Sequence, residues 1–220
     1  MKFEMLALGI AMPVALSGCM SPGTETGDFQ APQRLAELYN ATMDENHALV
    51  YSETAALPSS GSAEYSGAVM MVAATSVDAT TADLLMADST LSASFAAGGA
   101  TIDGDMTNWH GIQNIDATTL NNYIDAPETM IDDLNQGVGS GSLSISGTMT
   151  GPQDGLTVSG DVALNGTNYG VDGQVLTQFY GPNGEYVTIQ GGGDVGAPYV
   201  PTVTIDGQVG EGIILGLYGK

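Results

Sequence analysis

Few side chains in this sequence could carry out chemistry. The chain has two histidines, His47 and His110, and a single cysteine, Cys19. We find no G-x-S-x-G, H-E-x-x-H or P-loop pattern, the motifs that supply a nucleophile, a pair of metal ligands or a phosphate-binding loop. We therefore predict no catalytic group, metal site or cofactor, and expect that the protein is not an enzyme.

One pair of neighbouring side chains is a candidate contact site. Trp109-His110 stands at a predicted strand end, and Tyr123 follows in a polar stretch. These rings could contact a protein partner, or hold a haem or another aromatic ligand. The alternative that we favour is an aromatic plug at one mouth of a β-domain. His47 lies in a predicted loop, where a histidine is usually solvated.

The first residues have the pattern of a processing signal. A basic Lys2 precedes an apolar run at 5–16, and Leu16-Ser17-Gly18-Cys19 follows. This ending resembles the lipobox of bacterial lipoproteins, which implies that residues 1–18 are a signal peptide and that Cys19 becomes the lipid-modified (palmitate-bearing) N-terminus. Met20 after the cysteine resembles the outer-membrane sorting signal. The alternative is an ordinary signal sequence with a cysteine nearby by chance.

The chain is strongly acidic, with 25 Asp and Glu against 3 Lys and Arg and a net charge of −22. This charge excludes nucleic acid as a partner, because binding to phosphates requires basic groups. It also disfavours adsorption to anionic lipid headgroups, so we expect attachment to a membrane through the lipid alone. The acids could serve solubility, for example in a saline habitat, or form an acidic binding face.

The composition divides the chain into three parts. After the signal peptide, residues 19–61 are polar and contain Pro and Gly, as expected of a lipidated tether. Leu35, Leu38, Tyr39 and Met43 recur at helical spacing and predict a short helix at 33–43. Residues 62–220 are predicted to be one β-domain. With no second cysteine, this domain must be stabilised by packing and sheet closure.

Alternating apolar residues predict eight antiparallel strands in the domain. The expected strands are 64–73, 89–95, 100–109, 142–150, 156–163, 171–180, 186–192 and 212–218, with residues 202–208 a ninth or an outgrowth of the last hairpin. Gly147, Gly160 and Gly173 recur in mid-strand, where glycine relieves crowding in a bending sheet. The pattern predicts a soluble eight-stranded barrel with a filled interior, because one face is Ser, Thr, Asp and Gln rather than a lipid-facing apolar band.

Residues 110–140 are the least strand-like part of the domain. They are polar, rich in asparagine and interrupted by Pro127. Long connections inside compact domains are often functional, so this stretch is the first candidate for partner contact, although a spacer is the equal alternative.

The predicted last strand at 212–218 is apolar on both faces. In a closed barrel it must pair with the first strand, about 150 residues earlier, and its outer face must be covered. We predict that the helix at 33–43 covers this seam.

The turn Phe179-Tyr180-Gly181-Pro182-Asn183-Gly184-Glu185 and the ending GIILGLYGK at 212–220 resemble the lipoprotein β-barrel domain of transferrin-binding protein B. The resemblance covers residues 64–220 and implies a single-barrel surface lipoprotein. It carries over the fold and the anchor. The transferrin contacts of that family belong to a larger two-lobed chain and are not carried over.

These observations predict a lipid-anchored outer-membrane lipoprotein that faces the periplasm or the cell exterior. Its barrel would be a non-enzymatic binding domain that recognises a macromolecule or nutrient carrier, or an outer-membrane receptor, through its loops. The alternatives are a structural envelope lipoprotein without a specific ligand and a binder of haem or another small ligand.

Overall fold

The computed structural model describes residues 29–42, 56–125, 130–134, 137–192 and 199–220. The predicted signal peptide, Cys19 and His47 lie outside these residues, so the predictions made for them stay predictions. Among the described residues, every helix is too short or too polar to span a bilayer.

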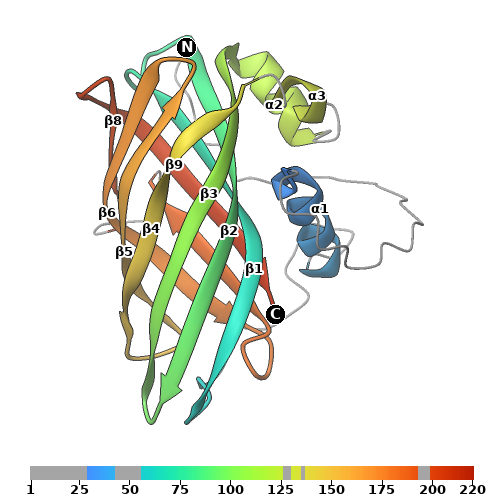
Figure 1. Cartoon of the computed structure of the whole chain (residues 1–220), viewed down its shortest axis with the longest axis vertical. Helices are drawn as coiled ribbons and strands as arrows, with labels where there is room; N and C mark the ends of the chain where they lie inside the picture. The colour runs from blue at the N-terminus through green and yellow to red at the C-terminus, as the bar shows by residue number, and fades with distance from the viewer. Residues whose placement is uncertain (1–28, 43–55, 126–129, 135–136, 193–198) are drawn as a thin grey trace.

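One antiparallel sheet closes on itself to form a barrel (Figure 1). Its strands are β1 (Gly61–Ala74), β2 (Thr81–Ala96), β3 (Gly99–Asp116), β4 (Gly139–Met149), β5 (Gln153–Leu164), β6 (Thr167–Tyr180), β7 (Tyr186–Gly191), β8 (Thr202–Ile205) and β9 (Gln208–Gly219). The predicted all-β class is confirmed. In β4 the exposed Ser142, Ser144 and Ser146 alternate with the buried Leu143 and Ile145, which is the polar-out, apolar-in pattern expected from the sequence.

Nine strands occupy eight positions in the barrel wall, because β7 and β8 share one position. β7 pairs with residues 176–180 of β6, and β8 pairs with residues 169–172 of the same strand. Both also pair with β9 on their other side. The predicted eight-stranded barrel is therefore confirmed, and the candidate ninth strand at 202–208 continues the position of β7 and opens the last hairpin.

The barrel closes where β9 meets β1. Their register runs from Ser66 opposite Gly219 to Ala74 opposite Glu211. Gly67 makes this approach possible, because a Cβ at that position would lie 2.2 Å from the Leu217 carbonyl oxygen. The predicted pairing of the first and last strands is confirmed.

Aromatic and polar side chains fill the two ends of the barrel interior. At the end where β2 turns into β3, the rings of Tyr65 and Phe95 pack edge-on against Phe179, with centroids 5.9 and 6.1 Å away. At the opposite end the buried Tyr169 donates a hydrogen bond of 2.7 Å to Asp83 Oδ2. The apolar interior between these ends is one continuous core.

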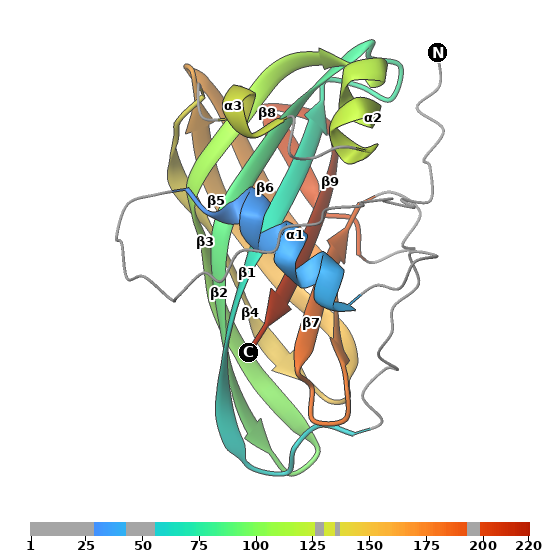
Figure 2. The ribbon, with the colours of Figure 1, turned by 90° about the vertical axis from the view of Figure 1, so that its right-hand side faces the viewer.

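Helix α1 (Ala31–Thr42) lies on the outside of the wall, across β1 and β9 (Figure 2). Leu38 and Tyr39 are buried against Leu217 of β9. Leu38 also covers Gly219, where a Cβ would lie 2.7 Å from the leucine Cδ2. The prediction that a short helix covers the apolar seam is confirmed, with the helix beginning two residues before position 33.

A second apolar cluster, which we call the outer cluster, covers the outside of β1, β2 and β3 beneath the helices. Short helices α2 (Ala117–Asp125) and α3 (Ile131–Leu134) lie at the end of the barrel where β3 ends (Figure 1). The outer cluster consists of Ala31, Ala68, Met70, Leu84, Met86, Ile115, Leu120, Met130 and Leu134. Because this wall is covered on both sides, residues 67–71 of β1 are all buried.

The connection that the sequence predicted at 110–140 begins later in the structure. β3 continues through residue 116, so the connection to β4 begins only at Ala117 and contains α2 and α3. Two register shifts between β2 and β3 interrupt the alternation of apolar and polar residues. Asn108 and Asn114 have φ values of 55° and 58° there. The alternation of apolar and polar residues stops at these positions although the strand continues, so the sequence predicted too short a strand.

Candidate functional site

A β-bulge in β3 reverses which of the two neighbours Trp109 and His110 faces the barrel interior. Pairing with β2 shifts register between Met86 and Asp88, opposite Asn108 with its left-handed backbone. Such a bulge re-aims the side chains that follow it. Trp109 points into the barrel, where it is 1% exposed and its indole N–H donates to the Met106 carbonyl at 3.1 Å. The indole therefore offers no exposed surface to a macromolecule.

His110 lies on the outer side of the same wall. Its ring stacks on Phe29, just before α1, with centroids 3.9 Å apart and planes 9° apart. Its Nδ1 lies 3.3 Å from the carbonyl oxygen of Leu134, at the end of α3. His110 thus joins α1, the barrel wall and α3. It does not share a space with Trp109, so the two rings do not form one pocket for a haem or another aromatic ligand.

Asp88 on β2 lies beside the start of α1. Its Oδ1 accepts a hydrogen bond of 3.2 Å from the Gln30 backbone N–H, and its Oδ2 accepts one of 2.6 Å from the side-chain amide of Asn108. Burial raises the pKa of Asp88, although these hydrogen bonds and the charge on His110 act in the opposite direction. A carboxylate beside a helix N-terminus stabilises the unpaired N–H groups there. Asp88 therefore fixes the point where α1 meets the barrel.

Tyr123 lies on α2 and holds this helix to α3. Its hydroxyl donates a hydrogen bond of 2.7 Å to Asp133 Oδ2. This hydrogen bond, together with partial burial and the charge of Asp133, raises the pKa of Tyr123. The ring packs against the outer cluster. The structure thus places Tyr123 and His110 at the same outer layer and Trp109 on the other side of the wall.

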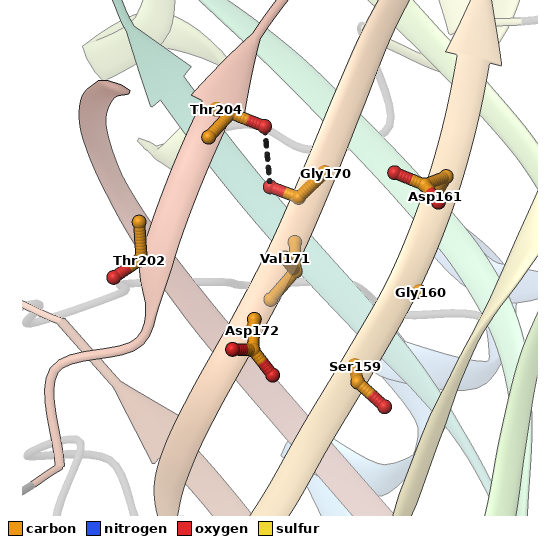
Figure 3. A pocket seen from close by; sticks show the side chains of 8 residues that line it. All are labelled: Ser159, Gly160, Asp161, Gly170, Val171, Asp172, Thr202 and Thr204. Atoms are coloured by element: carbon orange, nitrogen blue, oxygen red, sulfur yellow. Dashed lines mark hydrogen bonds between the residues drawn. The ribbon is translucent and has the colours of Figure 1, made fainter. Parts of the chain in front are cut away.

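A groove on a different wall forms a second candidate site (Figure 3). It has a volume of about 340 Å³ and crosses the outside of β5, β6 and β8. Gly170 keeps the groove open, since a Cβ there would lie 2.6 Å from Thr204 Oγ1 and 3.0 Å from Asp161 Oδ1. The lining residues are Ser159, Gly160, Asp161, Gly170, Val171, Asp172, Thr202 and Thr204.

The polar groups of this groove mainly accept hydrogen bonds. Two carboxylates, Asp161 and Asp172, lie among hydroxyl groups, and none of the lining residues is basic. The net charge of −22 would repel an anion from it. The groove is therefore suited to a ligand group that donates hydrogen bonds.

Sequence reasoning missed the residues that build these sites. Phe29 lies in the predicted tether, and nothing in its neighbourhood indicated that it would stack on a histidine 81 positions later. The alternating pattern predicted one polar face of Ser, Thr, Asp and Gln, and the exposed Asp161 and Asp172 lie on it. It could not show that Gly170 leaves a hollow between them, because that depends on the register of β5, β6 and β8.

Comparison with known proteins identified no matching family model, no similar curated protein and no similar solved structure. Within the described ranges, no three or more His, Cys, Asp or Glu side chains lie together in a way that could hold a metal ion.

Proposed function

We propose that the protein is a lipid-anchored lipoprotein of the outer membrane whose barrel binds a macromolecule or a nutrient carrier on its outer surface. The observation that carries this proposal is the filled interior. The largest fully buried side chains include Trp109, Tyr65, Tyr169, Tyr218 and Phe179, all inside the barrel. Eight-stranded barrels that hold a small ligand keep an interior cavity for it. With this interior filled, the outer surface is left for recognition.

Two features support the outer surface as the binding region. The connection between β3 and β4 does not take the shortest path but builds α2 and α3 at one end of the barrel (Figure 1). Strand β8, which shares a position in the wall with β7, contributes Thr202 and Thr204 to the groove on the outer surface. Connections that a rigid scaffold positions in this way are common binding sites.

The anchor rests on the sequence alone. Cys19 follows Leu16-Ser17-Gly18 at the end of an apolar run, and the chain has no other cysteine. The resemblance to transferrin-binding protein B lipoproteins supports the same location. Membership of that family and the binding of any carrier stay predictions. Helix α1 lies on the chain between Cys19 and the barrel, as a tether segment would.

Acyl labelling tests the anchor. In a bacterial host grown with an alkyne fatty acid, we expect the wild-type chain to be labelled and to sediment with outer membranes. Cys19→Ala should lose both the label and the sedimentation, because peptide contacts do not replace acyl chains, which contribute about 0.8 kcal/mol per buried CH₂. Equal labelling of Cys19→Ala would refute the lipoprotein assignment.

Cross-linking in the envelope tests the binding function. We compare the wild type with Asn121→Arg/Asn122→Arg, at two exposed positions of α2, and with the control Ser94→Arg/Thr101→Arg, an exposed cross-strand pair at the other end of the barrel. The proposal predicts a specific cross-linked product that the α2 variant loses and the control keeps. Labelling at Cys19 without any specific product would support the structural envelope lipoprotein instead.

A further inference from the structure

The segment that enters α1 is fixed to the barrel at its first residues. Phe29 stacks on His110, and the Gln30 N–H donates to Asp88, so two successive residues contact side chains of β3 and β2. Ala31 follows with no exposed surface, as a member of the outer cluster. The chain is therefore attached to the wall before the helix begins.

The helix itself adds further contacts along the seam. Leu38 is 4% exposed and packs with Tyr39 against Leu217, while Leu35 contacts both this group and the outer cluster. The Arg34 guanidinium donates a hydrogen bond to the Ser66 hydroxyl on β1. These contacts join α1 to the two strands that close the barrel, and the burial of two large side chains favours docking.

We infer that α1 is a docked tether segment that sets how far the barrel can stand from its membrane anchor. The inference rests on the lipid anchor at Cys19 proposed above. Phe29 is ten residues after Cys19, whereas Gly61, where β1 begins, is 42 residues after it. A fully extended chain spans at most about 3.4 Å per residue, so the docked tether reaches no more than about 35 Å, and a chain without docking reaches up to about 140 Å.

Docking also determines which wall faces away from the attachment point. The chain leaves the barrel at Phe29, over β2 and β3, and α1 lies over β1 and β9 (Figure 2). In a closed ring of eight positions, β5 lies four positions from β1. The groove across β5, β6 and β8 is thus on a different wall from the tether and stays open to a partner while the barrel is held near the membrane.

Two insertions distinguish a docked tether from a free one. The chain from Cys19 to Lys220 is coupled through its single thiol to a maleimide lipid in a supported bilayer, and neutron reflectometry measures the distance of the barrel from the bilayer. One variant carries 24 Gly and Ser residues between Gly27 and Asp28, and the other carries the same insertion between Glu45 and Asn46. The first lengthens the part between anchor and docking point, and the second lengthens the part after it.

The inference predicts that only the first insertion moves the barrel. Treated as a flexible chain, that tether grows from a root-mean-square span of about 17 Å to about 32 Å, an outward shift of about 15 Å. An equal outward shift for both insertions would overturn the inference. Because the lipid is attached chemically, this outcome does not depend on whether cells acylate Cys19.

A point variant tests the contacts that hold the helix. Leu38→Asp places a charge against Leu217, and we expect the second insertion to move the barrel in this background as far as the first. Ala41→Asp, the same substitution at an exposed position of α1, should leave the barrel where the wild type has it. A second insertion without effect in Leu38→Asp would contradict the role assigned to the seam contacts.

Discussion

A hydrogen bond inside the barrel connects its last strand to β2 across the intervening β1. The hydroxyl of Tyr218, which is fully buried on β9, lies 2.9 Å from Ser89 Oγ. Ser89 uses its own proton to donate to the Asp105 carbonyl at 3.0 Å. The Tyr218 hydroxyl must therefore be the donor to Ser89.

This direction predicts that the two single substitutions have unequal effects. Tyr218→Phe removes the donor and leaves Ser89 still bonded to Asp105, so we expect a loss of about 0.5–1.5 kcal/mol in the free energy of unfolding. Ser89→Ala leaves the phenol hydroxyl buried without a partner, which costs about 1–3 kcal/mol. The double variant should lose no more than Ser89→Ala alone, because the unpaired hydroxyl is gone.

Urea unfolding followed by circular dichroism measures these free energies, with the β-sheet signal as the observable. Ser142→Ala, at an exposed serine of β4, is the control and should change stability by less than about 0.5 kcal/mol. Equal losses for Ser89→Ala and Tyr218→Phe that add up in the double variant would refute the assigned hydrogen bond.

Two further predictions concern a helix start and a strand glycine. The Asp116 carboxylate accepts hydrogen bonds from the Thr118 and Thr119 N–H groups, which lower its pKa. The stabilisation of α2 by this carboxylate should therefore be complete above the ordinary Asp pKa and be lost as pH falls through the lowered pKa. Asp116→Ala should speed amide exchange in α2 at neutral pH. Unchanged exchange in this variant would contradict the capping role. Gly160 has a φ of 141°, and a Cβ there would lie 2.3 Å from the Ser142 carbonyl oxygen, so Gly160→Ala should destabilise the barrel by at least about 1–3 kcal/mol in thermal unfolding. Gly151→Ala, where a Cβ meets nothing within 4 Å, is the control, and equal melting temperatures for the two would refute the argument.

Local signals in the sequence were sufficient to predict most of the wall. The turn Gly181-Pro182-Asn183-Gly184 joins β6 to β7, and Gly184 has the positive φ of 62° that such a turn requires. The repeated glycines Gly147, Gly160 and Gly173 also have positive φ, which agrees with their predicted role in a bending sheet. The apolar excess of the last strand indicated a covering element, and α1 provides it.

The sites depended on contacts that local patterns do not encode. The bulge at Asn108 sends Trp109 inward and His110 outward, which is the reverse of what simple alternation from the buried Met106 indicates. The stacking of Phe29 on His110 joins segments that are far apart in the chain. The groove around Gly170 exists only once β8 pairs with β6, and the sequence left the place of that strand open.

Amide hydrogen exchange in β9 of the full chain tests most directly that the barrel is closed, and the proposal of binding at the outer surface depends on this closure. β9 pairs with β1 on one side and with β7 and β8 on the other, so its central amides should open only when the whole barrel unfolds. We predict opening free energies in residues 214–217 that equal those in the centres of β4 and β5. Exchange in β9 that is faster by several orders of magnitude than in β4 and β5 would show an open edge and contradict the closed barrel.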